Sequence, residues 1–363
     1  MAVNAGLAQL SDTLFTTSIA LYSLALVSYC GEYAFGRRGR VAETAAVPAT
    51  AKVLVGAGGP EVAPFAPPAS SASSAPSAPS AVSGEAGDGA AGSPEKFGRD
   101  AVVNRPAQRF GRLAVLLTLL GAAGHLTSIV LRGTAVDRIP WGNMYEFSSA
   151  VGFVAVAAFC VVLARQPRIR YLGMFVMLPV ILLMFLAGTV LYAKAAPLVP
   201  ALRSYWLAIH VTAAITATGT FLVSFVASVL YLIRERYDRL VPAGAGTIRF
   251  PVSLGSRLPE SRLLDQVAYR TVAFGFPVWT FGIAAGAMWA EAAWGRYWGW
   301  DPKETWAFIA WVIYAAYLHA RSTAGWRGRK AAWINLLGYG AMTFNFFVVN
   351  IVVAGLHSYA GLS

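Results

Sequence analysis

The side chains of this sequence best suited to hold a metal ion are the imidazoles of its four histidines, His125, His210, His319 and His357. Imidazole is a common metal ligand in proteins. Each of the four falls within or at the edge of an apolar segment, where a polar ring is costly and marks a candidate functional site. The alternative is a histidine that packs between helices with its hydrogen bonds satisfied. The position of each histidine must decide between the two interpretations.

A second group of distinctive residues is the segment Trp294-Gly-Arg-Tyr-Trp-Gly-Trp-Asp-Pro-Lys-Glu-Thr-Trp306, which holds four tryptophans and a tyrosine. Indole rings favour the headgroup region, so an aromatic belt at the membrane surface is one explanation. A belt spreads its aromatic residues over many helix ends, whereas here they share one loop with Gly295 and Gly299, which allow close backbone approach. The loop therefore suits a flat, apolar ligand.

The end of this segment also has a purely structural explanation. Asp301 stands where an N-cap residue belongs, Pro302 follows at the first helical position, and Glu304 occupies the third. Together they resemble a capping box. We therefore expect a helix to begin at Pro302, directly after the tryptophans.

The composition assigns these residues to a membrane protein. The chain is 57% hydrophobic and 13% charged, whereas soluble domains contain about 25% charged residues. Apolar segments of about twenty residues, long enough to cross about 30 Å of hydrocarbon, recur along the sequence. We expect an all-α polytopic transmembrane helical bundle of about eight helices, near residues 13–35, 111–131, 146–164, 171–193, 205–233, 267–290, 305–320 and 332–355.

The basic residues predict how this bundle is oriented. The net charge of +12 is concentrated in alternate connections between the spans, as the positive-inside rule requires of cytoplasmic connections. The charge therefore indicates topology and not a nucleic-acid partner. Both termini, and the connections 132–145, 194–204 and 291–304, are expected outside the cytoplasm.

The same patterns divide the chain into three parts. We expect an N-terminal transmembrane helix over residues 1–36 that persists as an anchor, because no clear cleavable signal precedes it. Residues 37–108 are rich in Ala, Pro, Ser and Gly and are expected to form a disordered cytoplasmic linker. Residues 109–363 form the main helical domain, with an external loop over 291–306. Cys30 and Cys160 fall in apolar spans without a CxxC or CxxCH motif and are expected to pack in the interior.

This topology assigns a depth to each histidine. His210 lies about one and a half turns into a helix that follows an outer connection, and His357 lies just beyond the outer end of the last helix, so both are expected level with the aromatic loop. His319 is expected about 20 Å below the outer surface. His125, at another depth, is expected to pack locally or line a pore. Two imidazoles beside an aromatic surface suit the iron of haem, which two axial side chains commonly hold.

The string Trp294-Gly-x-x-Trp298-x-Trp300-Asp301-x-x-Glu304-x-Trp306 resembles the tryptophan-rich WWD signature of the haem-handling CcsA/ResC proteins of System II cytochrome c biogenesis. These proteins are called CcsB in some bacterial lineages and are related more distantly to CcmF and CcmC. The segment Pro140-Trp-Gly-Asn-Met-Tyr-Glu146 is similar to the family's P-x-x-N-x-Y-E stretch. The resemblance extends through most of residues 110–363. The 41–100 insert and the first helix lie outside it.

The resemblance implies a protein of the bacterial inner (plasma) membrane that binds haem b without a covalent bond, exports it, and presents it at the outer face for attachment to the CxxCH motif of apocytochrome c. By the same resemblance, His210 and His357 correspond to the external haem ligands and His319 to an intramembrane ligand. A ResB-type (CcsB-type) membrane subunit is the implied partner and a source of the second ligand to His319. A thioredoxin-like thiol-reducing protein is a further partner. The chain would then be part of a haem lyase (holocytochrome c synthase) complex.

Within the aromatic loop, Trp298, Trp300 and Trp306 are expected to stack on or enclose the macrocycle, and Trp294 and Asp301 belong to the same binding loop. Arg296 and Lys303 would pair with a haem propionate or serve only the membrane topology, and both interpretations stay open. No residue stands out as a general acid or base for thioether formation. The protein is therefore expected to act by positioning haem.

Two other functions remain as alternatives. A haem-bearing subunit of an electron-transfer complex would need paired histidines at two depths and would leave the aromatic loop unexplained. A transporter of another substrate often shows inverted repeats and broken helices, and the sequence contains no convincing internal repeat. A lipid-modifying enzyme is disfavoured because few carboxylates are expected on the outer side.

Overall fold

The computed structural model describes residues 3–45, 105–197, 202, 204–243, 248–353 and 355. These residues form eight α-helices and two short 3-10 helices, and they contain no strand. The α-helices are α1 (Ala5–Ala45), α2 (Arg105–Ala135), α3 (Met144–Arg165), α4 (Gly173–Thr189), α5 (Tyr205–Leu240), α6 (Ser261–Trp294), α7 (Pro302–Ser322) and α8 (Arg329–Ile351). The 3-10 helices are η1 (Pro167–Leu172) and η3 (Val252–Arg257). The prediction of an all-α bundle is confirmed.

Seven of these helices are long and apolar enough to cross a membrane. The eighth, α7, is not among them, although it has 21 residues. Its two ends carry the charged residues Lys303, Glu304 and Arg321, which shorten its apolar stretch. The chain is therefore a multi-pass membrane protein, with one span fewer by length and composition than the sequence predicted.

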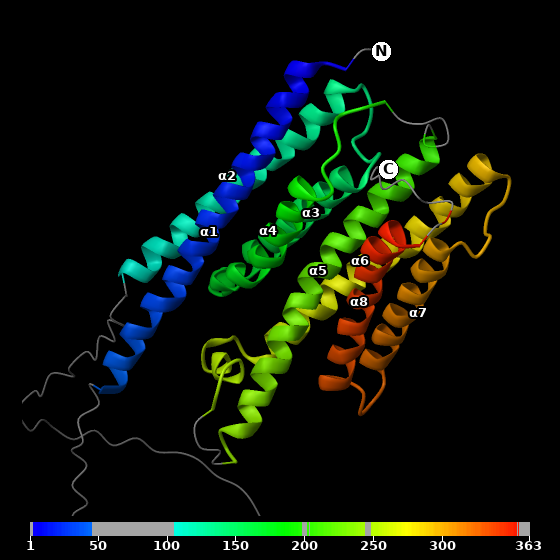
Figure 1. Ribbon diagram of the computed structural model, residues 1–363. Coiled ribbons are helices and arrows are strands. Elements are labelled where there is room, and N and C mark those ends of the chain that lie inside the picture. Colours follow the sequence, from blue (N-terminus) through cyan, green and yellow to red (C-terminus); the bar gives the residue numbers. More distant parts are fainter. Residues whose placement is uncertain are drawn as a thin grey trace, which may run out of the picture. The chain divides into compact units, whose positions relative to one another are not determined.

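Successive helices run in opposite directions (Figure 1). The starts of α3, α5 and α7 consequently lie at the same end of the bundle as the ends of α2, α6 and α8. This arrangement confirms that the connections 132–145 and 291–304 share one end. We call it the pocket end, because the cavity described below opens there.

Small residues allow the helices at the site to pack closely. A Cβ atom on Gly275 of α6 would lie 2.7 Å from the Phe221 ring of α5, and one on Gly338 of α8 would lie 3.1 Å from the Tyr314 ring of α7. The rings of Phe221 and Tyr314 are fully buried, and they stack on each other with their centroids 3.9 Å apart. This core joins α5, α6, α7 and α8 into the unit that carries the pocket.

An ion cluster fastens α1 and α2 to α3 near the pocket end. The buried Glu146 carboxylate accepts hydrogen bonds from Arg132 at 3.0 Å and from Arg138 at 2.9 Å. Arg132 also lies 3.2 Å from Asp12 of α1, and Tyr192 donates to Asp12 at 2.7 Å. Burial, with this bond to Asp12, raises the pKa of Tyr192 above its ordinary value. The cluster fixes the start of α3, which lines the pocket.

Two sequence expectations need adjustment. Helix α1 continues to Ala45 and α2 begins at Arg105, so helix covers both margins of the predicted linker. The rest of that linker, residues 46–104, lies outside the described residues.

Cys30 is exposed on α1, so the prediction that it packs in the interior is wrong. An apolar helix that faces lipid carries small hydrophobic residues on its outer face as well as its inner one.

Candidate functional site

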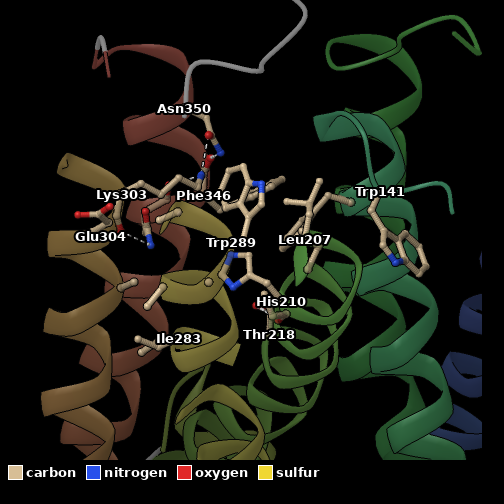
Figure 2. Close-up of a pocket in the computed structure, with 18 of the residues that line it drawn as sticks. Trp141, Leu207, His210, Thr218, Ile283, Trp289, Lys303, Glu304, Phe346 and Asn350 are labelled. Carbon is tan, nitrogen blue, oxygen red and sulfur yellow. Dashed lines mark hydrogen bonds between the residues drawn. The ribbon is translucent and has the colours of Figure 1, made fainter. Parts of the chain in front are cut away.

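A cavity of about 190 Å³ opens at the pocket end between α3, α5, α6, α7 and α8 (Figure 2). Helix α5 lines it with one face, because its lining residues follow the spacing of helical turns. These are Leu207, His210, Val211, Ala214 and Thr218. Thr218 lies about 20 Å along the helix from its first residue, Tyr205. The pocket thus runs from the loops at the pocket end into the membrane-spanning part of the bundle.

The ring of His210 is held by α6 on two sides. Its Nδ1 atom lies 2.7 Å from the carbonyl oxygen of Gly282 and must donate to it, because a carbonyl only accepts. The ring stacks on Trp289 with centroids 6.2 Å apart and an interplanar angle of 15°. A Cβ atom on Gly286 would lie 2.6 Å from Nδ1, so the ring fits only because position 286 has no side chain. With the proton on Nδ1, the lone pair of the neutral ring is on Nε2, the state in which imidazole binds metals.

The aromatic loop between α6 and α7 is fixed at both ends. Gly295 ends α6 in the left-handed conformation, with φ of 71°. The predicted capping box at the start of α7 is confirmed, because Asp301 accepts from Lys303 N at 3.0 Å and Glu304 accepts from Asp301 N at 3.1 Å. The same Glu304 oxygen accepts from Gly299 N at 2.8 Å. One carboxylate therefore closes the loop onto the first turn of α7.

The four tryptophans of the loop occupy different environments. Trp298 lines the pocket, and Trp300 is 66% exposed with its ring edge-on to Trp298 at 5.7 Å. Trp306 packs on Phe344 of α8 at 4.1 Å. Trp294 packs on Trp289 at 4.7 Å. Of the predicted tryptophans, Trp298 alone lines the pocket directly, while Trp294 contacts a residue that does.

The segment Pro140–Glu146 both lines the pocket and anchors itself. Trp141, Gly142, Asn143 and Met144 line the cavity, and the Trp141 indole donates to Thr212 of α5 at 3.0 Å. Asn143 caps α3 by accepting from Glu146 N at 2.9 Å. The Glu146 carboxylate in turn accepts from Gly142 N at 2.7 Å. Glu146 therefore connects the pocket wall to the ion cluster.

The walls of the pocket formed by α6, α7 and α8 contain several buried polar atoms that have no hydrogen-bond partner among the described residues. These are Trp279 Nε1, Glu304 Oε1 and Asn345 Oδ1. Lys303 also lines the pocket and donates to Asn350 Oδ1 at 2.5 Å (Figure 2). The Arg296 guanidinium lies against Gly299, in the space that a Cβ atom there would occupy. A buried polar atom without a partner is costly, so these groups point to a polar part of a ligand.

The other histidines lie elsewhere. His125 is fully buried between α1, α2 and α3, with Nε2 3.0 Å from Ser149 Oγ and Nδ1 3.4 Å from Tyr22 OH. His319 is exposed in the last turn of α7 and does not line the pocket. His357 lies outside the described residues. Among the residues that the structure describes, no group of three or more His, Cys, Asp or Glu side chains is placed to hold a metal ion.

Most of the residues that line the pocket were not predicted from the sequence, and Trp289, Phe346 and Asn350 are among them. Trp289 had a detectable signal, since it follows Gly282 and Gly286 at seven and three residues and so shares their helical face. Phe346 and Asn350 lie on α8 among many other apolar and polar residues. Nothing in their local pattern distinguishes them.

The fold and the pocket define a polytopic helical membrane protein with an aromatic-lined site at one end of its bundle. The model of the "Cytochrome C assembly protein" family matches residues 141–357, more than half of the chain, and it begins at the pocket residue Trp141. The chain belongs to this family.

Relatives from several organisms carry the name "Cytochrome c biogenesis protein CcsA". The protein of Gloeobacter violaceus is 35% identical over 300 residues, which cover 70% of this chain and 87% of the relative. That of Mesostigma viride is 32% identical over 272 residues, which cover 70% of this chain and 88% of the relative. That of Guillardia theta is 42% identical over 177 residues, which cover 47% of this chain and 59% of the relative.

Proposed function

We propose that this protein acts in cytochrome c maturation by binding haem b at the pocket end and presenting it to apocytochrome c. The observation that carries the proposal is His210, whose ring is fixed by Gly282, Gly286 and Trp289 in the tautomer that can ligate iron at the wall of an aromatic pocket. Family membership supports the maturation role. In this proposal haem is the cargo of the protein.

The pocket fits the chemistry of haem. Indole rings at Trp141, Trp289 and Trp298 supply apolar surface for a flat macrocycle. Lys303 Nζ and Trp279 Nε1 are donors suited to a propionate. The volume of about 190 Å³ is below the roughly 300–1,000 Å³ of pockets that enclose small ligands. Haem would therefore stand partly outside the pocket, where the two thiols of a CxxCH segment could reach its vinyl groups.

His357 is the proposed second ligand. Gly355, two residues before it, lies beside the aromatic loop, because a Cβ atom on Gly355 would be 2.8 Å from Asp301 Oδ2. Two residues span at most about 7 Å. The described residue nearest to His357 in the sequence therefore lies beside the aromatic loop, which supports the proposal.

The pocket end is proposed to face away from the cytoplasm of a bacterial inner membrane. Arg and Lys are concentrated at the opposite helix ends, where Arg165, Arg239, Arg327 and Lys330 lie. Apocytochrome c would then approach from the outer side. A thioredoxin-like protein that keeps its CxxCH thiols reduced would act on the same side.

His319 is proposed as a separate intramembrane ligand that works with a partner subunit. Its exposure on α7 and its absence from the pocket support this assignment. An outward-facing imidazole can meet a ligand from a ResB-type subunit packed against α7. Haem held there would precede haem at the pocket.

The test is the optical spectrum of the purified full-length protein, oxidised and reduced, alone and with a ResB-type partner. The wild type should carry b-type haem, and His210→Ala and His357→Ala should lose it or change its spectrum. His125→Gln is the matched control, because glutamine keeps hydrogen-bonding capacity at a position outside the pocket, and it should retain the wild-type spectrum. Persistence of the spectrum in the first two variants with loss in His319→Ala would confine stable binding to the intramembrane site. Absence of haem from every preparation would exclude the proposal and favour a transporter of another substrate.

A further inference from the structure

A second cavity, of about 280 Å³, lies within the membrane-spanning part of the bundle between α3, α4, α5 and α8. We call it the lateral cavity. Its α4 wall is formed by Pro179, Leu182, Leu183 and Leu186, and its α8 wall includes Tyr339, Thr343 and Phe347. The lining is mostly apolar, and the hydroxyl-bearing residues Ser148, Thr218, Tyr339 and Thr343 are its polar members.

The lateral cavity reaches the lipid-facing surface of the bundle. Leu182 lines it and is 60% exposed, and Thr343 across from it on α8 is exposed as well. Both helices qualify as membrane spans. The mouth of the cavity between α4 and α8 therefore faces hydrocarbon.

The lateral cavity adjoins the pocket at its other side. Phe147, Thr218, Met342 and Phe346 line both. Phe147 of α3 and Phe346 of α8 stack with ring centroids 4.9 Å apart and an interplanar angle of 22°. This stacked pair stands between the two spaces, and side-chain rotation of either ring would widen the passage.

We propose that haem passes between the membrane interior and the pocket through the lateral cavity, with the Phe147–Phe346 pair as its gate. The inference rests on the proposed function. Haem is an amphipathic macrocycle, with an apolar ring system and two carboxylates at one edge. Three of the buried polar atoms without a partner among the described residues, Trp279 Nε1, Glu304 Oε1 and Asn345 Oδ1, line the pocket, whereas one, Ser148 Oγ, lines the lateral cavity.

This distribution gives the route a direction. The carboxylate edge would lead toward Lys303 while the ring still lies among the leucines of α4. The faces of Phe147 and Phe346 suit a flat aromatic ligand as it passes. An acyl chain alone would leave the polar groups of the pocket without partners, whereas haem, with its flat ring system and two carboxylates, could occupy both adjoining spaces.

The test compares two tryptophan substitutions on α4 of the full-length protein. Leu182→Trp narrows the mouth of the lateral cavity. Leu178→Trp, one turn away at a position that is 50% exposed and does not line the cavity, is the matched control. Each protein is reconstituted without haem, and its uptake of haem from haem-loaded phosphatidylcholine vesicles is followed by absorbance. Equilibrium binding of haem added in detergent is measured in parallel.

Leu182→Trp should slow uptake from vesicles several-fold and leave the equilibrium spectrum unchanged, while Leu178→Trp should match the wild type in both. Leu186→Trp, which lines the same cavity, should repeat the result if Leu182→Trp does not fold. Uptake at the wild-type rate in the cavity variants would overturn the inference. The same rate together with loss of a co-purifying lipid would assign the cavity to an acyl chain. Failure of the wild type to bind haem even in detergent would instead refute the proposed function.

Discussion

His210 of α5 donates a hydrogen bond of 2.7 Å to the backbone carbonyl of Gly282 on α6. The ring orientation therefore depends on how these two helices pack, and not only on the residues beside His210. Gly286, one turn further along α6, completes the arrangement by leaving room for the ring. The proposed binding of haem by His210 should therefore be sensitive to substitutions in α6 that leave the imidazole itself unchanged.

Gly286→Ala should disturb the His210 ring, because the added Cβ would lie 2.6 Å from Nδ1. We expect an altered or weaker haem spectrum and a lower yield of mature cytochrome c in cells that depend on this protein. Gly340→Ala is the control, since a Cβ there meets nothing within 4 Å. Equal haem spectra in the two variants would show that the ring position does not govern binding.

Glu146→Gln should destabilise the fold strongly. It leaves the buried Arg132 and the nearby Arg138 without their shared carboxylate. Breaking a buried pair in this way costs about 3–5 kcal/mol. Thermal unfolding of the purified protein in detergent measures the loss. Glu235→Gln breaks a surface pair with Arg239 and should cost only about 0.3–0.5 kcal/mol, so similar melting temperatures for the two variants would contradict the prediction.

Asp301→Ala should loosen the junction of the aromatic loop and α7, because it removes the side chain that caps the helix. Loss of an N-cap costs about 1 kcal/mol. We expect a lower melting temperature and a lower haem content, and Asp301→Asn should restore much of the stability. Ser204→Ala changes the N-cap of α5, which makes no side-chain capping bond, and should leave both measurements unchanged.

His125→Ala should lower stability without changing the haem spectrum. The substitution removes the partner of the buried Ser149 and Tyr22 hydroxyls, and an unsatisfied buried group costs about 1–3 kcal/mol. His319→Ala, at an exposed position, should change the melting temperature little when the partner subunit is absent. A haem spectrum that depends on His125 would assign this residue to binding and refute the packing interpretation.

Features that depend on residues close together in the sequence, or on the order of the helices along the chain, were predictable from the sequence. The capping box at Asp301 and Glu304 is one such case, because N-cap chemistry acts over three neighbouring positions. The shared end of the connections 132–145 and 291–304 is another, since it follows from counting antiparallel spans. Both rest on short-range rules that packing does not override.

Residues brought together by packing were not predictable. Trp306 shares the aromatic loop with Trp298, yet it faces Phe344 of α8 and not the pocket. Phe346 enters the pocket wall only because α8 packs beside α5 and α7, which brings its ring onto Phe147 of α3. Such placements depend on helix rotation and on neighbours distant in the chain, which a sequence pattern does not specify.

Trp300 has a backbone φ of 57° in the aromatic loop. A left-handed conformation disfavours a residue with a Cβ atom by about 1–2 kcal/mol, and glycine avoids this penalty. The chain therefore carries a large, exposed indole where the smallest residue would fold more easily. Selection for thermal stability alone would favour glycine at position 300. Laboratory evolution of a more stable protein should therefore show whether stability and haem binding place opposing demands on this position.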